Sequence, residues 1–120
     1  MKVFNRSVAI LKGIFQRIEA ATATSGAATL NAYIGKVTSE ALTTAQNGIY
    51  TLTITNDKVK ASSVVLATVT DGTNSQGTPM VVRVTPAAGS LVITVANKHA
   101  SAEALNGTIV VSFQVINDVD

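Results

Sequence analysis

The chain has 120 residues, of which 47% are hydrophobic and 13% are charged, and its formal net charge is +2. This length suits one domain with a single core, and the balance of apolar and charged residues excludes an intrinsically disordered protein. Cysteine is absent, which excludes a disulfide scaffold and a cysteine nucleophile and favours synthesis inside a cell.

The first twenty residues differ from the rest of the chain in charge and in pattern. They carry four cations against Glu19, a net charge of +3, whereas five cations and six carboxylates give the remainder a net charge of −1. Their large apolar residues recur in steps of four and three, at Phe4, Val8, Leu11, Phe15 and Ile18. This spacing predicts one apolar face of a helix, with the cations largely on the other side. We therefore predict an N-terminal helical docking arm over residues 1–20.

The arm is expected to order only against a partner, because an isolated helix this short is marginal in water and Gly13 weakens it by about 1 kcal/mol. That partner could be the sandwich of the same chain, a second copy or a different protein. Helical periodicity and charge together give the predicted partner-binding residues: Phe4, Arg6, Val8, Leu11, Lys12, Phe15, Arg17 and Ile18. The same segment also fits a signal peptide, a membrane-surface helix or a polyanion-binding helix, but packing against protein is favoured, and we predict neither a membrane nor a nucleic-acid partner.

Residues 21–28 are small and polar and show no periodicity, so they predict a linker with Gly26 as its pivot. After the linker the pattern changes to period two. Tyr50, Leu52 and Ile54 alternate with threonines, which is typical of a strand with one buried and one solvated face. Similar runs predict further strands at 29–34, 36–42, 63–70, 79–85, 90–96 and 107–116, with turn signals between them.

Roughly seven or eight short strands without a helical pattern predict an all-β domain over residues 29–120, folded as a two-sheet antiparallel sandwich. Strand spacing alone fits jelly-roll and immunoglobulin-like connectivities equally well. The cysteine pair and the tryptophan of immunoglobulin domains are missing, which weakens that alternative. The predicted fold class is therefore an all-β, jelly-roll-like sandwich with an N-terminal amphipathic helical arm.

No residue pattern indicates catalysis, a cofactor or a metal. His99 is the only histidine and is expected to form hydrogen bonds within its own loop; a hydrolase would need it beside a carboxylate in a cleft. There is no nucleophile elbow and no phosphate-binding loop. The DGTNSQG stretch at 71–77 has one carboxylate, too few for calcium, and Asp118 and Asp120 fall in the C-terminal tail. We predict that the protein is not an enzyme.

Four stretches resemble proteins of one family: EALTTAQNGIYTLTITN, SVVLATVTDGTN, GTPMVVRVTPAAGSLVITVAN and HASAEALNGTIVVSF. Their strands, the TPAAGS hairpin and the ALNGT turn are similar to those of capsid cement or decoration proteins of tailed bacteriophages, and the resemblance covers about three-quarters of the chain. It implies a jelly-roll body and no transferable binding residues.

The resemblance also implies a function. A protein of this family is made in the host cytoplasm, joins the capsid exterior of the virion, and ties neighbouring subunits of the phage major capsid protein together. We expect a dimer or trimer that makes contact through its arm and its threonine-rich sheet edges. The alternative is a tail-fibre tip that binds a receptor or carbohydrate through loops 71–78 and 97–106.

Overall fold

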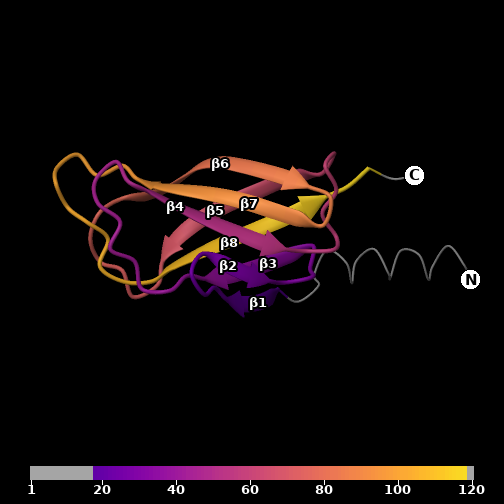
Figure 1. Cartoon of the computed structure of the whole chain (residues 1–120), viewed down its shortest axis with the longest axis horizontal. Coiled ribbons are helices and arrows are strands. Elements are labelled where there is room, and N and C mark those ends of the chain that lie inside the picture. The colour runs from indigo at the N-terminus through magenta and orange to yellow at the C-terminus, as the bar shows by residue number, and fades with distance from the viewer. Residues whose placement is uncertain (1–17, 119–120) are drawn as a thin grey trace, which may run out of the picture.

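The computed structural model describes residues 18–118, which form two four-stranded β-sheets packed face to face (Figure 1). Sheet A has the order β1-β3-β8-β5 and is built from β1 (Glu19–Thr22), β3 (Ile34–Thr38), β8 (Ile109–Ile116) and β5 (Val64–Asp71). Sheet B has the order β2-β4-β7-β6 and is built from β2 (Ala27–Thr29), β4 (Ile49–Thr55), β7 (Ser90–Asn97) and β6 (Pro79–Ala87). The predicted all-β, two-sheet fold is confirmed.

The core is mainly aliphatic, with Tyr50 and Phe113 as its aromatic members, and comes from the inward faces of both sheets. In β4 the side chains of Tyr50, Leu52 and Ile54 are buried and the threonines between them are exposed, as the alternation predicts. The fully buried side chains of the core include Val37, Leu52, Ile54, Leu91, Ile93, Val95, Ile109 and Val111. The strands that supply these side chains, β3, β4, β7 and β8, therefore present their other faces to the exterior.

Four of the six strand pairings are antiparallel, as predicted, but β1 pairs with β3 in parallel and β2 pairs with β4 in parallel. The wholly antiparallel prediction is wrong at these two edges. The cause is the path of residues 19–29, which run along sheet A, turn, and return along sheet B. The same path is followed by β3 and β4 one strand further in, so each outer strand runs in the direction of its neighbour.

The predicted linker differs from the structure. Most of residues 21–28 lie in β1, in β2 and in the corner between them, and the predicted arm of residues 1–20 ends inside β1; residues 1–17 lie outside the described residues. The run predicted as a strand at 29–34 is mostly the connection between β2 and β3. Strands of three or four small residues have too little alternation for a period to be recognised.

Gly26 is a constrained corner residue and not a pivot. Its φ is 75°, and a Cβ there would lie 2.6 Å from the Thr51 carbonyl oxygen. The Gly26 N–H donates to Oε2 of Glu40 at 2.7 Å, and the Tyr50 hydroxyl donates to Oε1 of the same carboxylate at 2.6 Å. One carboxylate therefore fastens the corner between the two sheets to β4.

Gly26→Ala is expected to lower the free energy of unfolding by about 2–3 kcal/mol, because the methyl group meets backbone in addition to the strained φ. Gly89→Ala is the matched control: Gly89 has a φ of 80° but nothing lies within 4 Å of the added Cβ. This control should lose only about 1 kcal/mol. Urea unfolding followed by circular dichroism measures both, and equal losses would contradict the close approach at the corner.

Stability should also depend on the charge of Glu40. Partial burial opposes its ionisation, but hydrogen bonds from the Tyr50 hydroxyl and from the backbone N–H groups of Glu40 and Gly26 outweigh that effect and lower its pKa below 4.5. A lowered folded-state pKa means that the ionised carboxylate stabilises the fold above its unfolded pKa and loses this contribution as the pH falls.

Glu40→Gln is therefore expected to lose roughly 1–2 kcal/mol of unfolding free energy at neutral pH. The difference from the unchanged protein should shrink as the pH falls below 4.5 and through the lowered folded-state pKa of Glu40, because protonation then removes the charge in both the folded and unfolded states. Urea unfolding at a series of pH values tests this. A difference that stays constant across the acidic range would show that the carboxylate charge is not what holds the corner.

Candidate docking surface

The two sheets expose outer faces of different character at the end of the sandwich where β8 terminates, on the right in Figure 1. There sheet A exposes large apolar side chains, with fractional exposures of 52% for Ile18, 58% for Val64, 57% for Leu66 and 44% for Ile116. The partly buried Ile34 of β3 completes the group. Contiguous exposed apolar side chains on a small protein indicate a contact surface. These five residues are called the apolar patch below.

Strand register brings the apolar patch together. Across β3, β8 and β5, Ile34 stands opposite Gln114, and Gln114 stands opposite Leu66. Two residues away along each strand, Val64 stands opposite Ile116. Alternate residues of a strand share a face, and residues that are directly or diagonally opposite in adjacent strands are neighbours on that face. Separate segments of the chain thus build the patch.

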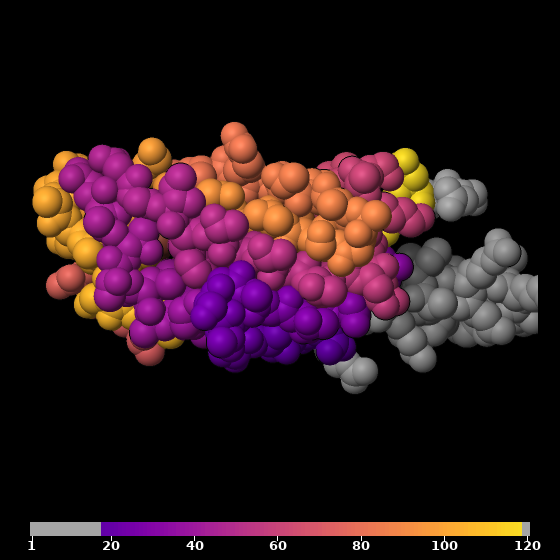
Figure 2. Space-filling model, viewed as in Figure 1, coloured from indigo at the N-terminus to yellow at the C-terminus, as the bar shows by residue number. Residues whose placement is uncertain are grey.

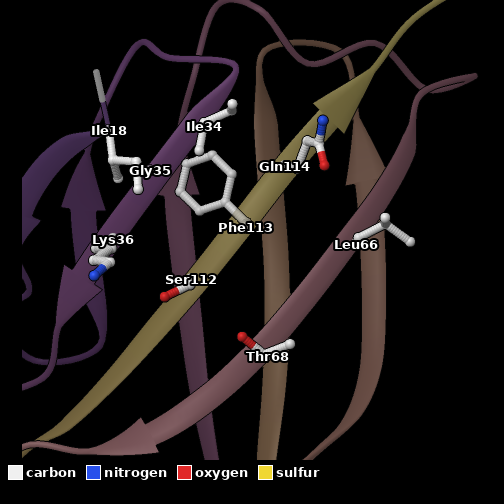
Figure 3. Close-up of a pocket in the computed structure, with 9 residues that line it drawn as sticks. All are labelled: Ile18, Ile34, Gly35, Lys36, Leu66, Thr68, Ser112, Phe113 and Gln114. Atoms are coloured by element: carbon white, nitrogen blue, oxygen red, sulfur yellow. The ribbon is translucent and has the colours of Figure 1, made fainter. Parts of the chain in front are cut away.

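A shallow groove of about 220 Å³ crosses this surface. Figure 3 shows the side chains that line it, from residues just before β1 and from β3, β8 and β5. The lining residues are Ile18, Ile34, Gly35, Lys36, Leu66, Thr68, Ser112, Phe113 and Gln114. Lys36 is the one charged side chain in this set. Such a lining can hold apolar side chains of a partner, and it offers no pair of groups for acid–base chemistry.

Of the eight predicted partner-binding residues, the structure places Ile18 at this groove. The other seven (Phe4, Arg6, Val8, Leu11, Lys12, Phe15 and Arg17) lie outside the described residues. Sequence reasoning missed Ile34, Val64, Leu66 and Ile116. A signal was present, because the VVLATV run of β5 is apolar at positions of both parities, but a fully buried strand gives the same pattern.

The opposite end of the sandwich carries polar loops, which Figure 2 shows packed against one another at the left of the molecule. Asn97 is fully buried there, and its amide nitrogen donates to the carbonyl oxygens of Thr44 at 3.0 Å and Glu103 at 2.8 Å. Its amide oxygen accepts from the N–H groups of Thr78 at 3.0 Å and His99 at 3.2 Å. One side chain therefore joins three loops.

His99 belongs to the same loops and is ordered locally. Its Nδ1 lies 3.2 Å from both the backbone nitrogen and the Oγ of Ser101. Its Nε2 lies 3.7 Å from Oε1 of Glu103, too far for a hydrogen bond, and that oxygen accepts from the Gly77 N–H at 2.7 Å. This confirms the expected hydrogen bonding within the loop. In the hydrolase alternative, Glu103 would be the carboxylate beside His99, but the two side chains are not hydrogen-bonded to each other.

The loop at 71–77 is also held by its own polar groups. The buried Asn74 donates to Oδ1 of Asp71 at 2.9 Å and to the Gln76 carbonyl at 2.8 Å, and it accepts from the Asn106 N–H at 2.8 Å. Over residues 18–118 no three or more His, Asp or Glu side chains gather where they could hold a metal ion. The same part of the chain contains no helix long and apolar enough to cross a membrane.

No family model matches the chain, and no curated protein or solved structure shows significant similarity to it. The resemblance to phage cement proteins therefore stays a prediction. The physical features of the molecule, above all the apolar patch, have to carry the functional argument.

The polar loops generate a stability prediction. Asn97→Ala is expected to lower the free energy of unfolding by about 2–4 kcal/mol, because four backbone groups lose the buried amide to which they are hydrogen-bonded. His99→Ala removes a partly exposed side chain from the same loops and should cost under about 1 kcal/mol. Thermal unfolding of both variants tests the assignment, and a His99 variant as unstable as the Asn97 variant would contradict it.

Proposed function

We propose that this protein is a non-enzymatic structural protein of a tailed bacteriophage, which binds the outer surface of the capsid and cements neighbouring subunits of the major capsid protein. The observation that carries the proposal is the apolar patch at the end of the sandwich from which residue 18 leads back into the N-terminal segment. A rigid body then offers two contact elements, the patch and the predicted basic, amphipathic arm that precedes Ile18 in the sequence.

Two linked contact elements suit the bridging of two capsid subunits. When one element is bound, the other is held at a high effective concentration near its own target, so two modest contacts give strong overall binding. The contacts themselves would be apolar side chains buried at the centre of the interface with polar groups at its rim. A dimer or trimer placed at a symmetry axis of the shell would multiply this effect.

The strand order supports the jelly-roll-like part of the proposal. In a jelly roll a long hairpin is wound so that the first strand pairs with the last and the second with the one before it. If β1 and β2 are set aside, β3 pairs with β8 and β4 with β7 in that nested order. Immunoglobulin domains instead place their first, second, fourth and fifth strands in one sheet, whereas the eight strands here divide into β1, β3, β5 and β8 and into β2, β4, β6 and β7.

A tail-fibre tip is the second candidate, and one observation favours it. Loops 71–78 and 97–106 lie together at the end opposite the patch, where the Lys98 N–H donates to the Thr78 carbonyl and the Ser75 N–H donates to Asn106. A protein anchored by its arm would present these loops outward. Carbohydrate sites usually include an aromatic platform, and neither loop contains an aromatic residue.

The capsid proposal is tested by co-sedimentation with expanded shells of the phage that encodes the protein. Deletion of residues 1–17 leaves β1 whole, since β1 begins at Glu19. The shortened protein should keep its β-sheet circular dichroism spectrum and bind at least about tenfold more weakly, because it has lost one of two linked contacts. The full chain should saturate the shells at a fixed stoichiometry.

Two results would contradict the proposal. Shells decorated at full occupancy by the shortened protein would leave the arm without a docking role. A full chain that does not sediment with shells but is enriched on one class of sugar in a glycan array would favour the tail-fibre tip.

A further inference from the structure

The apolar patch and the apolar stripe of the arm meet at one residue. Ile18 is the last member of the stripe that runs through Phe4, Val8, Leu11 and Phe15, and it also lines the groove on sheet A. We propose that in the free protein residues 4–17 form a helix that lies across the apolar patch of the same chain. The proposal concerns the protein alone and does not depend on the capsid.

The lengths of the stripe and of the groove agree. The groove extends from Ile18, just before β1, over β3 and β8 to Leu66 and Thr68 on β5. Three spacings between neighbouring strands separate β1 from β5, which amounts to roughly 14 Å. A helix rises about 1.5 Å per residue, so the ten residues from Val8 to Ile18 cover about 15 Å. The stripe from Val8 onward can therefore cross the whole groove, and Phe4, about 6 Å further along the helix, would lie beyond β5.

The chemistry of the two surfaces also agrees. The groove presents Ile34 and Leu66 with hydroxyl and amide groups beside them, and its one cation is Lys36. A strongly basic segment would be repelled, but the cations of the arm lie largely on the helix side opposite the stripe. With Leu11 and Phe15 against the sheet, Lys12 and Arg17 remain toward water. The arm thereby finds the apolar surface that a helix this short needs to be stable.

Binding within one chain is favoured over exchange between two copies. A segment joined directly to β1 is present at its own sheet at an effective concentration of about a millimolar, well above the micromolar concentrations of purified protein. Ile18 is outside regular secondary structure, so the chain can change direction there before entering β1. The occupant we assign to the patch is therefore the protein's own arm, and the basic face of that arm becomes the outer surface of sheet A.

Disulfide trapping tests this assignment directly, because the chain contains no cysteine. The test variant combines Val8→Cys with Leu66→Cys, the two positions that the length argument brings together on β5. The matched control combines Val8→Cys with Thr53→Cys, an exposed residue on the outer face of sheet B. Leu66 and Thr53 both project from folded strands into solvent, so neither substitution should unfold the sandwich.

After oxidation of the full chain at low micromolar concentration, we expect the test variant to form an intramolecular disulfide. It should run as a compact monomer on a non-reducing gel, with a yield about tenfold above the control. A disulfide-linked dimer in the test variant alone would assign the patch to the arm of a second copy and overturn the assignment. Equal, low yields in both variants would show that the arm does not lie on sheet A.

The outcome is separable from that of the capsid proposal. If the test variant forms the intramolecular disulfide but the protein does not bind shells, the arm lies on its own sheet and the proposed phage function is wrong. Shell binding without any disulfide would support the phage function and show that the arm does not lie on its own sheet.

Discussion

The inward faces of the two sheets pack on each other because alternate residues of each long strand are aliphatic, and everything else about the molecule depends on that contact. It uses one side of every strand and leaves the other side for the exterior. Threonine occupies most exterior positions of β4, where Thr51, Thr53 and Thr55 face water. Apolar residues occupy the first two exterior positions of β5, Val64 and Leu66, and the end of β8 at Ile116. Sheet A of the sandwich therefore has an apolar outer surface that the core does not need.

Buried asparagines secure the two ends of this sandwich where strands give way to loops. Asn97 joins three loops at one end, and at the other end the amide of Asn56 pairs with both the N–H and the carbonyl of Ala32. Each replaces strand pairing where the backbone leaves the ladder, and each is fully buried. Rigid ends keep the loops and the patch at opposite poles, which is the arrangement that a linking protein or a fibre tip would require.

The strands of seven or more residues could be located from the sequence, and the short β1 and β2 could not. The threonine alternation of β4 and the hairpin of β6 and β7 were predicted nearly in place, whereas β1 and β2 were interpreted as a linker. What holds those two strands is the carboxylate of Glu40 against Gly26 and Tyr50, a contact across fourteen and ten positions of sequence. The patch was missed for a related reason: its members come from segments that only the register unites.

The arm and the outer face of sheet A are expected to share a role. The sequence predicts an amphipathic segment whose helix is stable only when its apolar face is packed. The structure contains a solvent-exposed apolar patch, and Ile18 belongs to both the segment and the patch. A cement protein would benefit from such pairing, because its apolar elements would be shielded until a shell offers a larger contact. The polar loops at the far end would stay accessible throughout.

Trypsin digestion of the full chain tests this shared role most directly, because Lys12 and Arg17 are both cleavage sites in the arm. Replacing Leu66 by glutamate places a charge in the groove, whereas Thr53→Glu places one on sheet B. If the arm lies on the patch, the Leu66 variant should be cut after Lys12 and Arg17 about tenfold faster than the unchanged protein and the Thr53 variant, since a buried apolar contact is lost. Equal cleavage rates in all three proteins would contradict the account.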